Sequence, residues 1–534
     1  MNAAASVSFE FCIKRAKVAS IMCQYGAMDG MPSCANAKIN NALYRDTYGW
    51  DGFLVSDCDA VADFASHLNI TTDAQAAAYG IKGGLDVDCG TSYASITDAV
   101  KQGLVSETAV RTAAERFLAK QIALGALETT PFDRVGPAVV DSAEHRKLAL
   151  DAAAQSLVLL RNEKVVSHAG SAPLLPFSAD AKLVFIGPHT TSTVDLLGNY
   201  HGVNLQVLNR SIADVATQRG LRFSIADSAA GVGDADIAVL FLGLTTREEG
   251  EGRDRTSLEL PPDQLMLLAN VTAVQPRTAV VLVNGGALAI EALVAPGSPH
   301  QVPAILEAFY PGQAGAEAII GALLGEINPS GRLPYTMFPA GLVNRSAFDF
   351  DLQSDGGLTY QYYDGKYGKA VYEFGHGLSY TTFTYEWASE PRNSVDVKEL
   401  AVPGHGGCYS CESLQFSIKV TNTGARSGAA VVLGFVTMST PSHGGSSNTT
   451  AGGMAKKRAL FDFGRVALAA GSSTTLTLKM DGGCKQAVSM VDESGVRWVE
   501  PGRYSVSVGD AAAPATHAFE VAGTRAAIDA SCAL

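Results

Sequence analysis

Four carboxylates follow apolar runs, at points where parallel strands are expected to end. Asp57 closes "GFLVSD" (52–57), and three glutamates follow "DIAVLFLGL" (236–244): Glu248, Glu249 and Glu251. Glycoside hydrolysis uses two carboxyl groups that flank the scissile bond in one pocket. Each group also has a plainer explanation, because Asp57 would suit the N-cap of a helix over "AVADFASHL" and the glutamates would suit a solvated acidic loop. The sequence by itself does not bring the two groups together.

Other kinds of site have weaker support. The loop "FIGPHTTSTVDLLG" (185–198) follows a strand as a phosphate-binding loop would, but it lacks the second glycine of GxGxxG and the Lys-Ser/Thr pair of a P-loop. "CYSC" (408–411) has no second CxxC or His pair, so we expect no metal and no cofactor. "GNYHG" (198–202) would contact a sugar through Tyr200 or His201, although a simple turn explains it equally.

Charge and hydropathy exclude two classes of partner. The chain has 40 basic and 53 acidic residues, a net charge of −13, and no basic block, which argues against a nucleic-acid surface. No apolar run reaches the ~20 residues that cross a bilayer, so we expect no membrane partner. The N-terminal stretch shows no signal-peptide pattern. Five Asn-x-Ser/Thr sequons, at Asn69, Asn209, Asn270, Asn344 and Asn448, would suit an exported glycoprotein.

The elements that must position these carboxylates fall into three units. Residues 1–125 alternate continuous apolar runs with helical patterns, which predicts parallel strands covered on both faces; the strands are 18–26, 52–57 and 84–90. A polar residue ends each run, namely Tyr25, Asp57 and Asp86, and in a β/α barrel the catalytic groups lie at that end. A closed barrel needs eight such units, and only about three are present here.

A second set of strands predicts an open α/β sheet at 150–340, after a linker at 126–149. Its strands are expected at 182–188, 236–244, 278–286 and 303–312. A connector follows at 341–411. From 412 to 523 the apolar residues alternate, which predicts an antiparallel β-sandwich of fibronectin type III or immunoglobulin type.

Many motifs, in one order along the chain, resemble glycoside hydrolase family 3. They include "VASIMCQYGAMDGMPSCAN" (18–36), "GFLVSDCDAV" (52–61), "GGLDVDCGTSY" (83–93), "AAAQSLVLLRNE" (152–163) and "VYEFGHGLSYTTF" (371–383). The resemblance implies an α/β multidomain fold: the C-terminal part of a (β/α)8 TIM-type barrel, then an open α/β sandwich, then a fibronectin type III-like domain. "SDCDAV" and "DCG" resemble the β-xylosidase branch, since β-glucosidases usually have Trp after Ser-Asp.

The resemblance also assigns roles to residues. It implies that Asp57 is the nucleophile that forms a glycosyl-enzyme, with Tyr25 beside it. The general acid/base is expected at the first Glu of "EGEGRDR", which is Glu249, with Glu251 second and Glu248 third. The implied substrates are short xylo-oligosaccharides from xylan, cleaved one terminal sugar at a time outside the cell. Alternatives in the family are β-glucosidase and α-L-arabinofuranosidase activity, and an alternative outside catalysis is a carbohydrate-binding remnant.

Two departures from the family pattern weaken the expectation of activity. Gly26 stands where the family has Asn after the Tyr of "CSYN". The family's barrel begins about two hundred residues earlier, by the usual size of the fold. We therefore expect a truncated chain that is inactive as it stands, whose second and third domains still fold.

Overall fold

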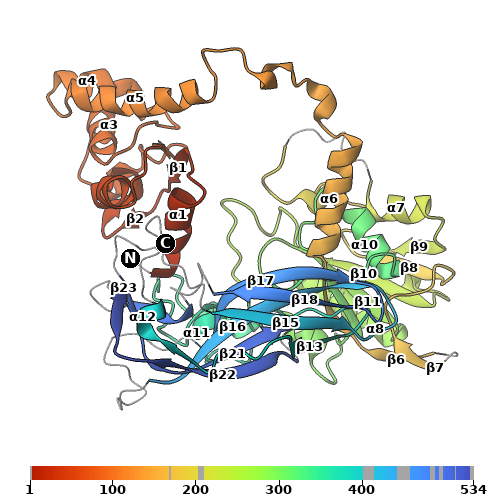
Figure 1. Ribbon diagram of the computed structural model, residues 1–534. Helices are drawn as coiled ribbons and strands as arrows, with labels where there is room; N and C mark the ends of the chain where they lie inside the picture. The colour runs from red at the N-terminus through yellow and green to blue at the C-terminus, as the bar shows by residue number, and fades with distance from the viewer. Residues whose placement is uncertain are drawn as a thin grey trace.

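The computed structural model describes residues 3–167, 170–202, 210–400, 414–441, 457–480, 487–491, 497–510 and 513–528. Figure 1 shows three units: a small mixed unit at the N-terminus, a larger α/β unit, and a β-sandwich. Predicted features that fall between these ranges lie outside the described residues, among them "CYSC" and the sequons at Asn209 and Asn448.

The first unit is built on two parallel strands, β1(Ser20–Cys23) and β4(Phe53–Ser56). The third predicted strand, 84–90, forms only a single parallel bridge, between Val87 and Val55. The helical patterns predicted between the apolar runs are confirmed as a π-helix, η2(Lys38–Thr47), and as α3(Asp73–Lys82). The remaining elements are α1(Ala3–Lys14), β2(Ala27–Met28), β3(Met31–Pro32), η1(Ser33–Ala35), α2(Phe64–His67), η3(Ser92–Ser95), α4(Ile96–Lys101) and α5(Glu107–Ala123).

The second unit begins after an exposed stretch that includes two short helical turns, η4(Pro131–Arg134) and η5(Pro137–Val139). Its six-stranded sheet has the order β5-β12-β11-β10-β8-β9. All neighbours pair in parallel except β5, which runs antiparallel to β12 at one edge. The strands are β5(Val158–Asn162), β8(Leu183–Ile186), β9(Phe223–Ala226), β10(Ile237–Gly243), β11(Thr278–Val283) and β12(Ala304–Glu307).

Helices cover both faces of this sheet, which explains why its central strands are apolar throughout. Every residue of β8, β10, β11 and β12 is buried. One face packs against α6(Ala143–Ser156), α7(Ile212–Gln218) and α10(Gly315–Leu324), and the other against α8(Pro262–Val274) and α9(Glu291–Val294). The remaining elements are a hairpin, β6(Lys164–Ser167) with β7(Gly170–Pro173), and the short turns η6(Asp195–Leu197), η8(Ala229–Gly231) and η9(Ala340–Asn344).

The third unit is a β-sandwich, as the alternating pattern predicts. One sheet has the order β13-β15-β18 and the other β14-β22-β21-β16-β17, and their inner faces share one apolar core. Its strands are β13(Phe383–Trp387), β14(Ser394–Asp396), β15(Gln415–Asn422), β16(Gly428–Pro441), β17(Ala459–Leu468), β18(Ser473–Lys479), β21(Gly502–Gly509) and β22(Ala515–Ala522). A small third sheet contains β19(Ser489–Val491), β20(Arg497–Val499) and β23(Ala526–Ile528), and two short helices are α11(Thr359–Tyr362) and α12(Val397–Leu400).

Asp86, which ends the third apolar run, is a structural residue of the first unit. Its carboxylate is fully buried and lies 2.6 Å from Nη2 of Arg45 and 3.2 Å from Nη1 of Arg116. It also accepts a hydrogen bond of 2.8 Å from the backbone N–H of Leu54 in β4. One carboxylate therefore joins the π-helix, α5 and β4. This structural role explains why an acidic residue ends the third apolar run, and no catalytic role is needed.

We predict that Asp86→Asn destabilises the first unit by about 3 to 5 kcal/mol, because it leaves two guanidinium groups without their buried counter-charge. Native-state hydrogen exchange of the Leu54 amide measures the loss. The matched control is Asp98→Asn, which breaks an exposed ion pair to Lys101 and should cost less than about 1 kcal/mol. Equal protection in both variants would contradict the structural role of Asp86.

Candidate active site

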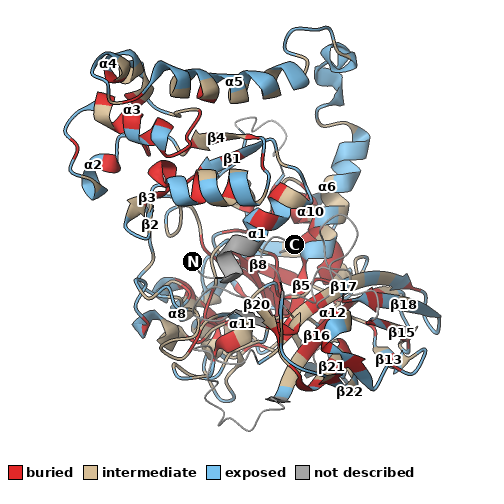
Figure 2. Cartoon of the chain, turned by 60° about the vertical axis from the view of Figure 1, so that its left-hand side comes forward, coloured by how far each residue is buried: buried red, intermediate tan, exposed pale blue. Residues whose placement is uncertain are grey.

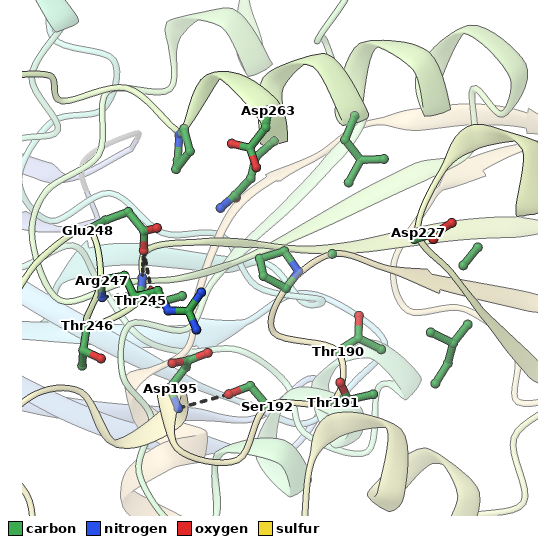
Figure 3. Close-up of a pocket in the computed structure, with 17 residues that line it drawn as sticks. Thr190, Thr191, Ser192, Asp195, Asp227, Thr245, Thr246, Arg247, Glu248 and Asp263 are labelled. Atoms are coloured by element: carbon green, nitrogen blue, oxygen red, sulfur yellow. Dashed lines mark hydrogen bonds between the residues drawn. The ribbon is translucent and has the colours of Figure 1, made fainter.

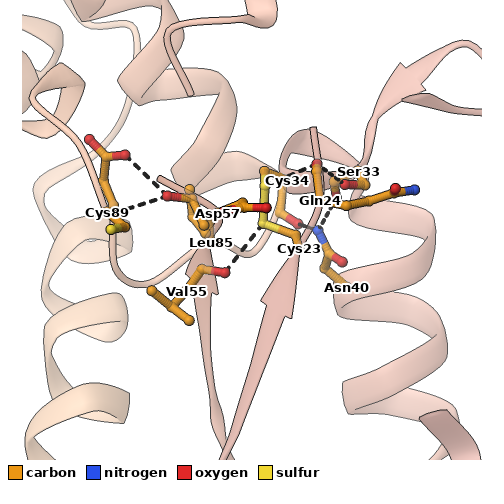
Figure 4. Close-up of a disulfide and its surroundings, with 12 residues drawn as sticks. Cys23, Gln24, Ser33, Cys34, Asn40, Val55, Asp57, Leu85 and Cys89 are labelled. Carbon is orange, nitrogen blue, oxygen red and sulfur yellow. Dashed lines mark hydrogen bonds between the residues drawn. A yellow bond between two sulfur atoms is a disulfide. The ribbon is translucent and has the colours of Figure 1, made fainter. Parts of the chain in front are cut away.

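Asp57 lies just past the carboxyl end of β4 and caps no helix. Its backbone N–H donates to the carbonyl of Cys23, and its Oδ1 accepts a 2.8 Å hydrogen bond from the N–H of Cys58. The next helix, α2, begins only at Phe64 and has Asp63 before it. The capping explanation therefore does not apply, and the partly exposed carboxylate remains accessible at the end of the strand (Figure 4).

Two disulfides secure the strand ends around Asp57, and the sequence did not reveal either pairing. Cys23 at the end of β1 bonds to Cys34, and Cys58 bonds to Cys89. The second bond joins the residue next to Asp57 to the segment that follows the Val87 bridge. Cys58 is thus part of a cross-link that holds the loop carrying Asp57, in addition to being a marker of the xylosidase branch.

The three candidate glutamates have very different surroundings. Glu248 is held locally, because its Oε2 accepts hydrogen bonds from the N–H (2.8 Å) and the hydroxyl (2.5 Å) of Thr245. Glu249 points into the second unit. Glu251 is exposed, and the hydroxyl of Tyr200 donates a hydrogen bond to its Oε2.

Glu249 is anchored by donors on several sides. Its carboxylate accepts hydrogen bonds from the N–H of Gly285 (2.7 Å), the N–H of Gly286 (2.9 Å) and the hydroxyl of Tyr310 (2.6 Å). Nε of Arg255 lies 3.8 Å away. A Cβ at Gly286 would come within 2.5 Å of Glu249 Oε2, so this close approach requires glycine. These contacts fix the Glu249 carboxylate within the second unit.

Asp57 and Glu251 share the same two tyrosines, although they belong to different units. The pKa of Tyr25 is raised by loss of solvation and by the charges of Asp57 and Glu251. The pKa of Tyr200 is raised by its hydrogen bond to Glu251, by loss of solvation, and by the charges of Glu251 and Asp57. Each phenol therefore lies within electrostatic range of both carboxylates. The hydroxyl of Tyr25 donates to the carbonyl of Cys58 (2.7 Å), which fixes it beside the nucleophile candidate.

A separate hollow of about 980 Å³ lies between the ends of β8 and β10, where the strand order reverses (Figure 3). Sheets of this kind bind ligands at such a point. The loop that had been considered for phosphate lines this hollow, but the charges there are mostly negative. The charged lining residues are Asp195, Asp227, Glu248 and Asp263, with Arg247 as the one cation among them. This lining repels phosphate, so the hollow gives no support to nucleotide binding.

Glu307, at the end of β12, is a fully buried carboxyl behind Glu249. Its Oε1 accepts a 2.9 Å hydrogen bond from the N–H of Phe309. Burial, with a smaller contribution from the charge of Glu249, raises the pKa of Glu307 to about 8. The group is therefore protonated in the folded protein at neutral pH, and it ionises with an ordinary pKa when the chain unfolds.

We predict that Glu307→Gln stabilises the protein at pH 8 by about 2 kcal/mol and changes little at pH 4. The sign follows from proton uptake. Between pH 4.5 and 8 the folded state holds a proton that the unfolded state has lost, so the stability contributed by Glu307 falls as pH rises. Urea unfolding at a series of pH values measures the effect. The exposed Glu259→Gln is the control, and a pH dependence that is the same in both variants would contradict the prediction.

Within the described residues, no three His, Cys, Asp or Glu side chains group in a way that could hold a metal ion. The same part of the chain contains no helix with the length and apolar character that crossing a bilayer demands.

Comparisons with known proteins give a match for each of the three units. Residues 1–119 match the glycosyl hydrolase family 3 N terminal domain, 157–380 the family 3 C-terminal domain, and 447–512 the fibronectin type III-like domain. Beta-D-xylosidase 1 of Arabidopsis thaliana is 34% identical over 95% of this chain and 67% of its own length. Beta-xylosidase/alpha-L-arabinofuranosidase 2 of Medicago sativa subsp. varia is 31% identical over 94% of this chain and 66% of its own.

Solved structures give the same result. The GH3 exo-beta-xylosidase XlnD, in complex with a xylobiose aziridine activity-based probe, superposes with a TM-score of 0.86 and 29% identity, over 97% of this chain and 68% of that one. A β-glucosidase from Erythrobacter marinus gives 0.75 and 26%, over 96% and 69%. The chain spans about two thirds of the length of these proteins. Its three units are part of the family's barrel, the family's α/β domain and a fibronectin type III-like domain, and the chain belongs to glycoside hydrolase family 3.

Proposed function

We propose that the protein is a retaining, exo-acting glycoside hydrolase that releases terminal β-D-xylose from xylo-oligosaccharides. The observation that carries the proposal is the convergence of Asp57 and Glu251 on Tyr25 and Tyr200. The site combines one carboxylate from the barrel unit with one from the α/β unit, as a two-carboxyl mechanism requires. The names of the relatives from Arabidopsis and Medicago, and of XlnD, support xylose as the sugar.

In this proposal Asp57 attacks the anomeric carbon and forms a covalent glycosyl-enzyme. Glu251 first donates a proton to the leaving oxygen and then removes a proton from the water that releases the sugar. Glu251 replaces Glu249, our first choice from the sequence, in the acid/base role. The reason is that Glu249 already accepts hydrogen bonds from Gly285, Gly286 and Tyr310, whereas Glu251 is exposed and is bound by Tyr200, whose phenol also senses the charge of Asp57.

Two other activities remain open within the same site. The Medicago relative carries both xylosidase and arabinofuranosidase in its name, which supports α-L-arabinofuranosidase as a side activity. β-Glucosidase activity would use the same carboxylates with room for one more CH₂OH group. Rates on nitrophenyl xyloside, arabinofuranoside and glucoside distinguish the three. A carbohydrate-binding remnant would bind xylobiose without turning it over.

We further propose that the protein works in an oxidising compartment outside the cytosol. The two disulfides of the first unit support this, because such bonds persist where thiols are not kept reduced. Three sequons in the described residues, at Asn69, Asn270 and Asn344, have exposed side chains that an N-glycan could reach. Intact-mass measurement before and after enzymatic removal of N-glycans tests this proposal.

We predict that Asp57→Ala lowers kcat/KM on nitrophenyl β-xyloside by at least about 10⁴-fold relative to active wild-type protein. An activated 2-fluoroxyloside should add one sugar mass to the wild type at the peptide that contains Asp57, as detected by mass spectrometry. Asp59→Ala is the matched control, since this neighbouring carboxylate should take no label. Label at another residue, or none with full turnover, would contradict the nucleophile assignment. The 534-residue chain assayed alongside tests the expectation that it is inactive by itself.

We predict that Glu251→Ala lowers activity, whereas Glu249→Ala lowers thermal stability. Loss of the acid/base should slow substrates with poor leaving groups by about 10²-fold or more, and should spare dinitrophenyl xyloside in the glycosylation step. Azide should restore the turnover of Glu251→Ala by replacing water, with xylosyl azide as the product. Glu249→Ala should instead lower thermal stability, because it leaves the donors of Gly285, Gly286 and Tyr310 unpaired. Azide rescue of Glu249→Ala alone would return the acid/base role to Glu249.

A further inference from the structure

The loop at 198–200 lies alongside the loop that carries the glutamates, residue against residue. Gly198 packs on the ring of Tyr310, the residue whose hydroxyl binds Glu249, and a Cβ at Gly198 would lie 2.6 Å from that ring. A Cβ on Gly250 would lie 3.2 Å from Oδ1 of Asn199. Tyr200 then donates to Glu251. The two loops are therefore in contact at two successive positions, Asn199 with Gly250 and Tyr200 with Glu251, while Gly198 packs beside them on Tyr310.

From this register we propose that Tyr200 is a positioning residue that holds Glu251 toward Asp57. The inference rests on the proposed function, because it concerns the same carboxylate. Glu251 is exposed, and a free glutamate side chain would sample several rotamers. The hydrogen bond from Tyr200 fixes Oε2 and leaves Oε1 free to exchange a proton with the leaving oxygen and with water.

Tyr200 also lies within electrostatic range of the nucleophile candidate. The charge of Asp57, which belongs to the other unit, raises the pKa of the Tyr200 phenol, and the Tyr200 side chain is 78% exposed. A largely exposed ring at this position can cover one side of a bound sugar while its hydroxyl holds Glu251. Tyr25 differs, because its hydroxyl donates to the carbonyl of Cys58 and has no hydrogen bond to Glu251 among the described contacts.

The hydrogen bond makes a prediction about leaving groups. Tyr200→Phe should lower kcat/KM about tenfold on substrates with poor leaving groups, because Glu251 is no longer held in place to donate a proton. It should leave dinitrophenyl xyloside nearly unaffected in the glycosylation step, because this leaving group needs little proton donation.

The matched control is Tyr79→Phe, which removes the hydroxyl of an exposed tyrosine on α3, outside the proposed site. This variant should keep wild-type rates on both kinds of substrate. Labelling of Asp57 by an activated 2-fluoroxyloside needs no proton donor, so Tyr200→Phe should label within about twofold of the wild-type rate. An equal loss of rate on good and poor leaving groups, or labelling that falls together with hydrolysis, would overturn the positioning role.

A second measurement needs no turnover and separates this inference from the proposed function. In protein with ¹³Cζ-labelled tyrosine, the Tyr200 resonance is assigned as the one lost in Tyr200→Phe. Its pKa should be above the ordinary value, because of the hydrogen bond to Glu251, and should fall in Glu251→Gln but not in Glu249→Gln. A Tyr200 titration that does not respond to Glu251→Gln would refute the contact, even in a protein that hydrolyses xylosides. An intact response in a protein without activity would instead refute the hydrolase proposal alone.

Discussion

The direction of Glu251 depends on the anchoring of Glu249. Four polar groups hold the Glu249 carboxylate inside the α/β unit, and two of them are backbone N–H groups of Gly285 and Gly286, which follow β11. This contact ties the loop after β10 to the neighbouring strand. Gly250, the next residue, is half-buried, and Glu251 after it is exposed to solvent. A loop without that anchor would not hold any glutamate in a fixed direction toward Asp57.

The same principle applies on the other side of the site. Asp57 follows β4 directly, and the strand is fixed by its pairing with β1, by the buried Asp86 carboxylate and by the Cys58–Cys89 disulfide. Asp57 thus follows the end of a fixed strand, and Glu251 lies in a loop that the Glu249 contacts hold to the α/β unit. On both sides the groups that fix the geometry are distinct from the carboxylate that they support.

Much of the fold could be predicted from the sequence, because buried parallel strands appear as continuous apolar runs. The strands at 182–188, 236–244, 278–286 and 303–312 are confirmed for this reason. β9 was missed because Ser224 and Ile225 at its centre are exposed, so its run lacks the apolar signal. Residues 84–90 were assigned as a strand because of their apolar character, but only Val87 pairs.

The site was harder to predict than the fold. Asp57 follows a strand within a specific motif, so one short stretch of sequence suffices to single it out. The choice among Glu248, Glu249 and Glu251 depends on Gly285 and Gly286, more than thirty residues away, and on the loop that carries Tyr200. No local pattern encodes such contacts. The sequence singled out Tyr200 only as a sugar contact in the turn "GNYHG", as an alternative to His201, and not as a partner of Glu251.

The segment that joins the first two units makes the protein susceptible to proteolysis. Residues 124–140 cross from one unit to the other and are largely exposed, including Leu124, Leu127 and Phe132 at 76, 78 and 80% (Figures 1 and 2). Exposed segments of this kind are where proteases cut. A single cut there would leave both folded cores intact, but it would separate the unit that carries Asp57 from the unit that carries Glu251. Cleavage of the connecting segment would therefore abolish activity without unfolding either unit.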